Sequence, residues 1–130
     1  MEQTREKLNA DLALLKSALN TLEEALREPK TDLARDATIQ RFEYVFELSW
    51  KTISVAANYM GLSCQSPREA VKAAFKQGWI HDPEDWLEAL DARNKTSHTY
   101  NEKLAKQVYE IAQKFPHLVR PLTDAMGRLA

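Results

Sequence analysis

The amino-acid sequence predicts an all-α protein. Only three glycines occur among the 130 residues, and the sequence has neither the period-2 alternation of strands nor an Asn-Gly or Asp-Gly hairpin turn. In several long segments the apolar residues recur at intervals of three and four, which is the spacing of one helix face. We therefore expect one domain over residues 1–130, an antiparallel up-and-down bundle of four main helices plus a short helix.

A first helix is predicted from about Thr4 to Arg27. Six leucines in this segment follow alternating steps of four and three, which puts them on one side of a helix. They are Leu8, Leu12, Leu15, Leu19, Leu22 and Leu26. Pro29 should end this helix, because proline cannot continue the hydrogen-bond ladder and disfavours helix in the residue before it.

A second long helix is predicted from Thr31 or Asp32 to Met60, with Gly61 as its stop. Its apolar face follows the same spacing. The face consists of Ile39, Phe42, Phe46, Ser49, Ile53, Ala56 and Met60. Three more residues widen this surface beyond one stripe, so we expect the helix to face two neighbours. They are Tyr44, Val45 and Trp50.

Two shorter helices begin with proline signals. Ser66-Pro67-Arg68-Glu69 is a capping box with proline at the first helical position, and the helix that it opens should end at Gly78. Asp82-Pro83 repeats the signal, with Asp82 expected to cap a helix that runs into Arg93-Asn94. Trp86, Leu87 and Leu90 are its apolar residues.

The last helix should be capped by Asn101 or Thr99. Its apolar face is formed by Leu104, Val108, Ile111, Ala112 and Phe115. Pro116 and Pro121 are expected to bracket a separate C-terminal piece, since proline interrupts a helix interior.

Composition and missing motifs exclude several function classes. Eighteen Lys and Arg against 19 Asp and Glu give a net charge of −1, so nucleic acid would have to bind a local patch. The single Cys64 excludes an internal disulfide and a cysteine zinc cluster, and no metal or cofactor is expected. Gly-Ser and Asp-x-Asp motifs are missing, so the chain is not itself a nucleotidyltransferase. No apolar stretch reaches membrane-spanning length, which predicts a cytoplasmic protein.

The segment from Arg93 to Tyr100 carries the chemistry that remains. Positions 93 and 98 lie ~140° apart on an ideal helix, so their side chains would converge better if the helix ended or tightened between them. Asn94 could hydrogen-bond to His98 and orient it. His98 can move a proton near neutral pH, and Arg93 can brace a phosphate. These groups suit metal-free RNA cleavage, in which the ribose 2′-hydroxyl attacks its own phosphate.

The Arg-x4-His-x-Tyr string of Arg93, His98 and Tyr100, with asparagine after the arginine, resembles the signature of HEPN domains. It is most similar to the toxin of HEPN–MNT toxin–antitoxin pairs, which are also called nucleotidyltransferase substrate-binding proteins. The similarity extends through residues 41–51 and 66–70 and from Trp86-Leu87 onward. It covers roughly residues 35 to 115, with these blocks in the expected order.

The resemblance implies a HEPN-like bundle that forms a homodimer and is encoded near a small nucleotidyltransferase, the MNT antitoxin. Arg93 and His98 would be the ribonuclease pair acting on RNA, with Asn94 as the orienting residue. Tyr100 would be the tyrosine that the partner modifies with AMP to silence the toxin. Cyclising cleavage needs both a base and an acid, and each motif has one histidine, so we expect cleavage to require the dimer.

Simpler interpretations stand beside this one. Arg93 could pair with Glu43 or Glu47 while His98 caps a helix end, and Tyr100 could be a half-buried bundle residue. The chain would then be a non-catalytic subunit that presents a substrate to a nucleotidyltransferase, or a scaffold whose motif no longer works.

A second uncertain feature is a basic stripe at i, i+4 and i+8 formed by Arg68, Lys72 and Lys76. A solvated helix face is the simpler explanation of this stripe, and the alternative is that it contacts the RNA backbone together with Lys95. Trp50, Trp79 and Trp86 are interpreted as core or dimer-interface anchors.

Overall fold

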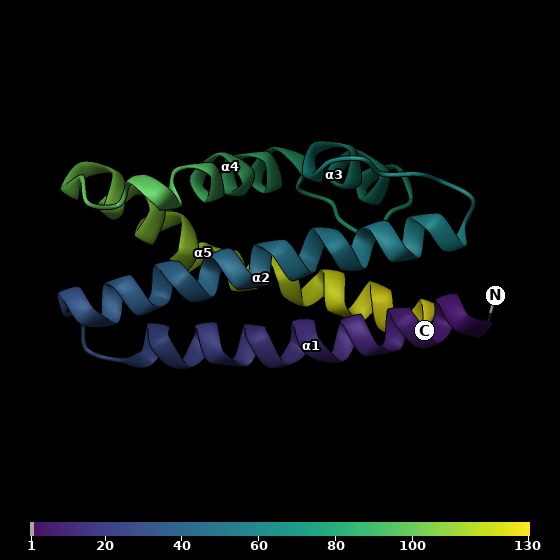
Figure 1. Cartoon of the computed structure of the whole chain (residues 1–130), viewed down its shortest axis with the longest axis horizontal. Coiled ribbons are helices and arrows are strands. Elements are labelled where there is room, and N and C mark those ends of the chain that lie inside the picture. The colour runs from purple at the N-terminus through teal and green to yellow at the C-terminus, as the bar shows by residue number, and fades with distance from the viewer. Residues whose placement is uncertain (1) are drawn as a thin grey trace.

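The computed structural model describes residues 2–130, and the all-α prediction is confirmed over that range (Figure 1). No strand forms in these residues. Five α-helices and one short 3-10 helix follow one another along the chain. They are α1 (Glu2–Arg27), α2 (Asp32–Tyr59), α3 (Pro67–Lys76), α4 (Pro83–Asn94), the 3-10 helix η1 (Thr96–His98) and α5 (Glu102–Leu129).

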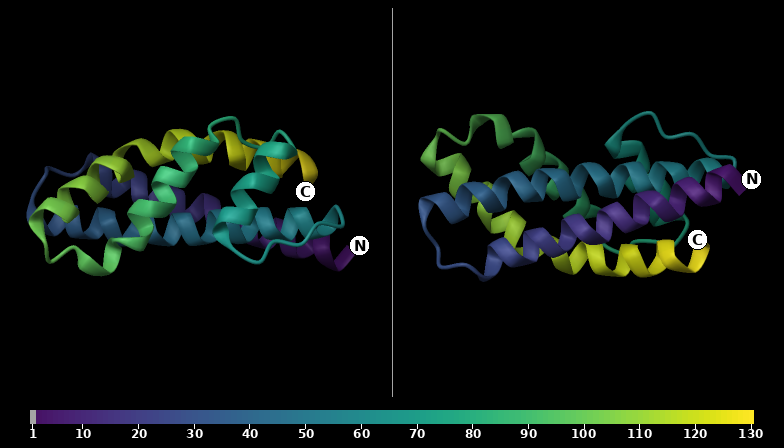
Figure 2. Two further views of the ribbon diagram at one scale, coloured as in Figure 1. Left: turned by 90° about the horizontal axis from the view of Figure 1, so that it is seen from above. Right: turned by 60° about the horizontal axis from the view of Figure 1, so that its bottom comes forward.

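The long helices α1, α2 and α5 pack side by side, and α3 and α4 lie on the opposite side of α2 from α1 (Figures 1 and 2). The chain runs along α1, returns along α2, runs back through α3 and then α4, and returns along α5. This is the predicted up-and-down bundle with one short extra helix. α2 contacts every other α-helix as well as η1, so it forms the centre of the bundle.

The leucine spacing of α1 correctly predicts its buried face. Of the six leucines on the predicted face, five are buried, and Leu26 is partly buried against the same core. At the centre of the bundle, the ring of Phe115 meets Phe42 edge-on at 5.1 Å and Trp86 at 5.2 Å between ring centroids. Such aromatic pairs contribute about 0.5–1.5 kcal/mol each beyond the area that they bury.

Two expectations for the apolar face of α2 were wrong. Met60 lies beyond the helix end and is exposed, and Tyr44 is 56% exposed. α1 and α4 each cover only part of the helix circumference, and Tyr44 falls in the sector between its neighbours. The other predicted core positions of α2 are buried, and Trp50 is partly buried.

α5 is one continuous helix, which corrects the expected break at Pro116 and Pro121. Both prolines lie inside the helix, and Pro116 is buried. Each proline removes one backbone hydrogen bond, but burial of Phe115, Val119 and Leu122 on one face maintains the helix through both positions. α5 is visibly bent (Figure 2), as expected where prolines interrupt the ladder.

Most predicted helix ends are confirmed. Ser66 Oγ accepts a hydrogen bond from the Glu69 backbone N–H at 3.2 Å, and Gly61 and Gly78 follow α2 and α3 with φ of 82° and 78°. Asn101, one of the two candidates, caps α5 through the Leu104 N–H at 3.2 Å. Asp82 is the N-cap residue of α4, as predicted, but its side chain makes no capping hydrogen bond in the described structure. Its ψ of 64° departs from the extended backbone that brings a capping oxygen under the helix.

In the part of the chain that the structure describes, no helix combines the length and apolar character that crossing a membrane requires.

Candidate functional site

The candidate motif lies on the turn that joins α4 to α5. α4 ends at Asn94, and the next residues tighten into η1, so the predicted end of the helix between positions 93 and 98 is confirmed. Thr96 Oγ1 donates to the Arg93 carbonyl at 2.8 Å, and the His98 N–H donates to the Lys95 carbonyl at 3.0 Å. These bonds satisfy one carbonyl in the last turn of α4 and that of its C-cap residue, and they fix the turn relative to the helix.

Arg93 is held in place by three neighbours. Its Nη2 donates to Glu47 of α2, its Nη1 donates to Asn94 Oδ1 at 3.0 Å, and its guanidinium lies 5.9 Å from the ring centroid of Phe46. The side chains of Arg93 and Glu47 are 29% and 28% exposed. The pairing of Arg93 with Glu47, one of two partners considered from the sequence, is confirmed.

Glu47 is itself oriented by a neighbour on its own helix. Trp50 Nε1 donates to Glu47 Oε2 at 3.2 Å, so one carboxylate oxygen faces Trp50 and the other faces Arg93. In the hydrogen bonds described over residues 2–130, Arg93 uses two of its five N–H donors. The remaining donors and the partial exposure of the guanidinium leave it able to contact a phosphate oxygen.

His98 and Tyr100 are both exposed, and Tyr100 is 84% exposed. Their rings are perpendicular, with centroids 6.0 Å apart. The expected hydrogen bond between Asn94 and His98 is not formed in the described structure, where the Asn94 side-chain oxygen accepts from Arg93. The turn therefore groups Arg93 with Glu47 and His98 with Tyr100, and no hydrogen bond joins the two groups within residues 2–130.

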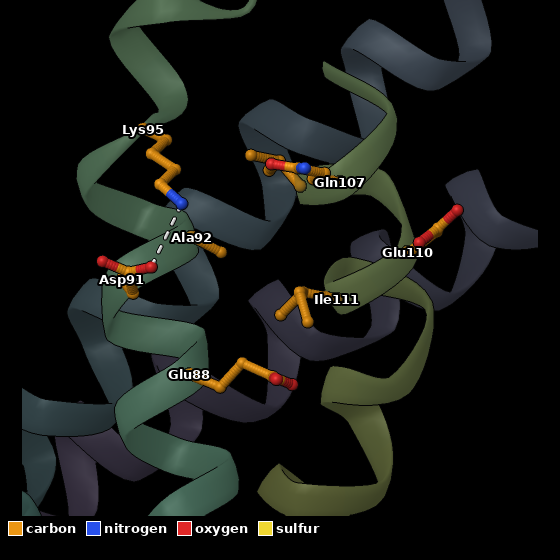
Figure 3. A pocket seen from close by; sticks show the side chains of 8 residues that line it. Glu88, Asp91, Ala92, Lys95, Gln107, Glu110 and Ile111 are labelled. Carbon is orange, nitrogen blue, oxygen red and sulfur yellow. Dashed lines mark ion pairs between the residues drawn. The ribbon is translucent and has the colours of Figure 1, made fainter. Parts of the chain in front are cut away.

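Lys95 occupies an acidic setting. A cavity of about 250 Å³ between α4 and α5 is lined by Lys95 together with three carboxylates (Figure 3). Lys95 Nζ lies 3.2 Å from Asp91 Oδ2, and Glu88 and Glu110 line the same cavity. These charges oppose the approach of a phosphate, so the surroundings disfavour the predicted RNA contact at this residue.

The basic stripe of α3 is distant from the motif along the bundle. Its residues Arg68, Lys72 and Lys76 are exposed. α3 lies at the end of the molecule that holds the C-terminus, whereas η1 and the start of α5 lie at the other end (Figures 1 and 2). An RNA strand bound to this stripe would have to extend along the whole of α4, which is about 18 Å long, to reach His98.

Sequence reasoning missed the surroundings of Arg93 on α2. The sequence predicts Phe46 as a core residue alone and Trp50 as a core or interface anchor, yet Phe46 also lies under the guanidinium and Trp50 orients its partner. The sequence spacing could have revealed these contacts. Phe46 lies one residue before Glu47 and Trp50 three residues after it, so all three lie on adjoining faces of one helix. Trp79 and Trp86, by contrast, are buried as predicted.

A family model described as "Nucleotidyltransferase substrate binding protein like" matches residues 10–128. The chain belongs to this family. The resemblance predicted from the motif is thereby confirmed, and the match extends well beyond the segment on which it was based. The nucleotidyltransferase substrate-binding family accounts for nearly the whole bundle, from α1 to the end of α5.

A named protein and two solved structures are similar to this chain. The "Probable ribonuclease HepT" of Haemophilus influenzae is 36% identical over 76 residues, which are 55% of this chain and 52% of the relative. The matched segment thus spans about half of that protein. A crystal structure from Thermus thermophilus is 33% identical with a TM-score of 0.80, covering 86% of this chain and 98% of its own.

A second solved structure is that of HI0074 from Haemophilus influenzae, described as revealing the fold of a substrate binding domain of a nucleotidyltransferase. It is 26% identical with a TM-score of 0.79, and covers 88% of this chain and 98% of its own. The bundle is therefore the fold of this family.

Proposed function

We propose that this chain is the toxin of a two-component system, a metal-independent RNA endonuclease of the cytoplasm that is silenced when a partner nucleotidyltransferase adds AMP to Tyr100. One observation carries the proposal: the turn after α4 presents the rings of His98 and Tyr100 together on the surface, 6.0 Å apart. The name of the relative, probable ribonuclease HepT, supports the same activity.

In the proposed cleavage, His98 takes the proton of a ribose 2′-hydroxyl. The 2′-oxygen then bonds to the adjacent phosphorus while the bond from phosphorus to the 5′-oxygen breaks, which leaves a cyclic phosphate and a 5′-hydroxyl. Arg93 donates to the phosphate oxygens and stabilises the charge that builds up on them. Glu47 and Phe46 hold the guanidinium, so Arg93 keeps its orientation before RNA arrives.

The departing 5′-oxygen needs a proton, and one motif offers a single imidazole. We propose that His98 of the partner subunit supplies it in a homodimer. The surface proposed for this contact is the groove of about 760 Å³ between α1 and α2, where Leu14 and Tyr44 are 57% and 56% exposed. Glu47 also lines the groove, so a second copy seated there would lie beside the carboxylate that holds Arg93.

Silencing follows from the position of Tyr100. The phenol oxygen attacks the α-phosphorus of a nucleoside triphosphate bound to the partner, the bond to pyrophosphate breaks, and the phenolic proton is lost. Tyr100 then carries a nucleotide and a negative charge beside His98, where both would repel an RNA phosphate. The exposure of the tyrosine meets the need of a separate enzyme to reach it.

The activity is tested by incubating purified protein with single-stranded RNA in the presence of EDTA. We expect cleavage that ends in a 2′,3′-cyclic phosphate, and no cleavage of the same strand carrying 2′-deoxyribose. His98→Ala should lose cleavage while remaining folded. Full cleavage by both Arg93→Ala and His98→Ala would overturn the catalytic assignment.

The dimer is tested by Leu14→Glu, which puts a charge on the proposed contact. We expect this variant to elute as a monomer and to lose cleavage without unfolding. Leu33→Glu is the matched control, because Leu33 is exposed at the start of α2 and outside the groove. A fully active Leu14→Glu variant would refute this surface.

A second candidate function is a non-catalytic subunit that presents a substrate to a nucleotidyltransferase. It is favoured by the family description and by the pairing of Arg93 with Glu47, which occupies part of the guanidinium. Mass spectrometry after co-expression with the nucleotidyltransferase separates the two. Added AMP on wild type that is lost in Tyr100→Phe supports the toxin, whereas a tight complex with unmodified Tyr100 and no RNA cleavage supports the subunit.

A further inference from the structure

A cavity of about 440 Å³ lies at the end of the bundle where three segments meet: the α1–α2 connection, the beginning of α2 and the first turns of α5. We refer to it as the basic pocket. Four of its six lining residues are cationic and one is acidic. The lining consists of Lys30, Arg35, Glu102, Lys103, Lys106 and Tyr109.

Most of the positive charge of the basic pocket is not neutralised within the protein. Arg35 and Glu102 form a two-pronged pair, with Nη1–Oε2 at 2.9 Å and Nη2–Oε1 at 3.3 Å. This hydrogen-bonded contact lowers the pKa of Glu102, so the carboxylate stays ionised and committed to Arg35. In the part of the chain that the structure describes, none of the ion pairs involves the three lysines of the pocket.

Tyr109 links two of the segments that line the basic pocket. Tyr109 is buried, and Lys30 Nζ lies 4.8 Å from the centroid of its ring, a cation–π contact between the α1–α2 connection and α5. Lys103 and Lys106 are three apart on α5 and share one face of the helix. The lysines therefore stand on a defined surface, where they can meet successive phosphates of one strand.

The basic pocket adjoins the candidate motif. Glu102 follows Tyr100 by two residues, and α5 carries the chain from the exposed turn directly into the pocket. Lys95 and the basic stripe of α3 are less well placed to bind RNA near the motif. Lys95 is paired with Asp91, and the stripe of α3 lies at the opposite end of the bundle (Figure 1).

We infer that the basic pocket binds the phosphate backbone of the RNA strand beside the phosphate that is cleaved. The inference rests on the proposed ribonuclease function and deepens it, because it locates the RNA track on α5 and the α1–α2 connection. Uncompensated lysines on a protein of net charge −1 provide the local patch that RNA requires. The pocket contributes to binding equally before and during cleavage, so it should affect KM more than kcat.

The test compares three variants for cleavage of a labelled single-stranded RNA and for its binding in the His98→Ala background. The pocket variant is Lys30→Gln with Lys103→Gln and Lys106→Gln. The charge-matched control is Lys7→Gln with Lys16→Gln and Arg128→Gln, all exposed and outside the pocket. The rival track is tested by Lys72→Gln with Lys76→Gln on α3.

We expect the pocket variant to bind RNA at least about tenfold more weakly at low salt. The slope of log binding constant against log salt concentration should become shallower by about 2, because three phosphate contacts are lost. Its KM should rise by a similar factor with kcat within about threefold. Glu102→Gln should act in the opposite direction and tighten binding, because it removes the one carboxylate of the pocket. The control should match wild type.

Three results would overturn the inference. In the first, the wild type cleaves RNA while the pocket variant keeps its KM and salt slope, or changes no more than the control; the ribonuclease proposal would survive this. In the second, the α3 variant alone loses RNA affinity. In the third, the pocket variant keeps RNA affinity but no longer binds the nucleotidyltransferase, which would make the pocket a protein contact. Failure of the wild type to bind or cleave any RNA would defeat both proposals.

Discussion

Replacing Arg93 by alanine separates a catalytic from a structural role, because the two roles predict different ratios of lost activity to lost stability. The side chain makes one ion pair with Glu47, one hydrogen bond with Asn94 and one cation–π contact with Phe46. All are partly exposed to water, which screens them. Glu47 also keeps its hydrogen bond from Trp50 when Arg93 is removed, so it is not left without a partner.

The expected loss of stability is therefore small. A partly exposed ion pair contributes up to about 1 kcal/mol, and a cation–π contact near the surface about 0.5–1 kcal/mol. Arg93→Ala should destabilise the protein by about 1–2 kcal/mol, which lowers Tm by roughly 4–8 °C for a domain of this size. Loss of one donor to the charge that develops in the transition state costs about 10²–10³ in kcat.

The assay measures kcat on single-stranded RNA in EDTA together with a thermal melt of each variant. Arg93→Lys should restore most of the stability by keeping a cation near Glu47, but little of the rate, since lysine lacks the planar two-pronged donor. Arg120→Ala is the control, because Arg120 pairs with Glu23 between α5 and α1, away from the motif. An Arg93→Ala variant that melts many degrees lower but retains kcat within about threefold would refute the catalytic role.

Three further predictions concern the bundle itself. Phe115→Ala should cost about 3–5 kcal/mol in the free energy of unfolding, measured by urea titration, because the ring is fully buried between aromatic neighbours, whereas Leu33→Ala should stay within about 0.5 kcal/mol. The hydrogen bond from Arg35 lowers the pKa of Glu102, so stability from this pair is full above the ordinary glutamate pKa of about 4.3 and is lost as pH falls through the lowered value. Urea midpoints of wild type and Glu102→Gln should accordingly converge on acidification. Burial raises the pKa of the Cys64 thiol, so at pH 8 iodoacetamide should alkylate it more slowly than a cysteine in the urea-unfolded chain, as followed by mass spectrometry.

Helices and their ends were predictable from the sequence wherever they depend only on residues close together in the chain. The leucines of α1 and the proline that begins α3 depend on residues within one or two turns, and both predictions are confirmed. Where packing against other helices opposes a local preference, the prediction fails. Pro116 and Pro121 signal an interruption, but the apolar residues around them are buried against α1 and α2 and maintain the helix. Tyr44 continues an apolar surface in sequence, yet no neighbouring helix covers it.

In the candidate site, too, the local features were predictable from the sequence and the contact between two helices was not. The end of α4 before His98 was predictable, because Thr96, Ser97 and Thr99 favour caps and turns over a helix interior. The partner of Arg93 was limited to Glu43 or Glu47, which share a face of α2. The packing of α4 along α2 selects Glu47, where Phe46 and Trp50 flank it. That choice depends on the relative position of two helices, which periodicity within one helix does not contain.

The basic pocket shows what counting charges along the chain does not reveal. The stripe on α3 is visible in the sequence because its cations recur every four residues of one helix, yet it lies far from the motif. The pocket takes Lys30 and Arg35 from one stretch of sequence and Lys103 and Lys106 from another about 70 residues later. Neither stretch is conspicuous alone, since Asp32 and Asp36 accompany the first and Glu102 the second. Folding commits Glu102 to Arg35 and leaves three lysines together in a pocket that α5 joins to the turn carrying Tyr100, so a chain of net charge −1 acquires a local cationic surface.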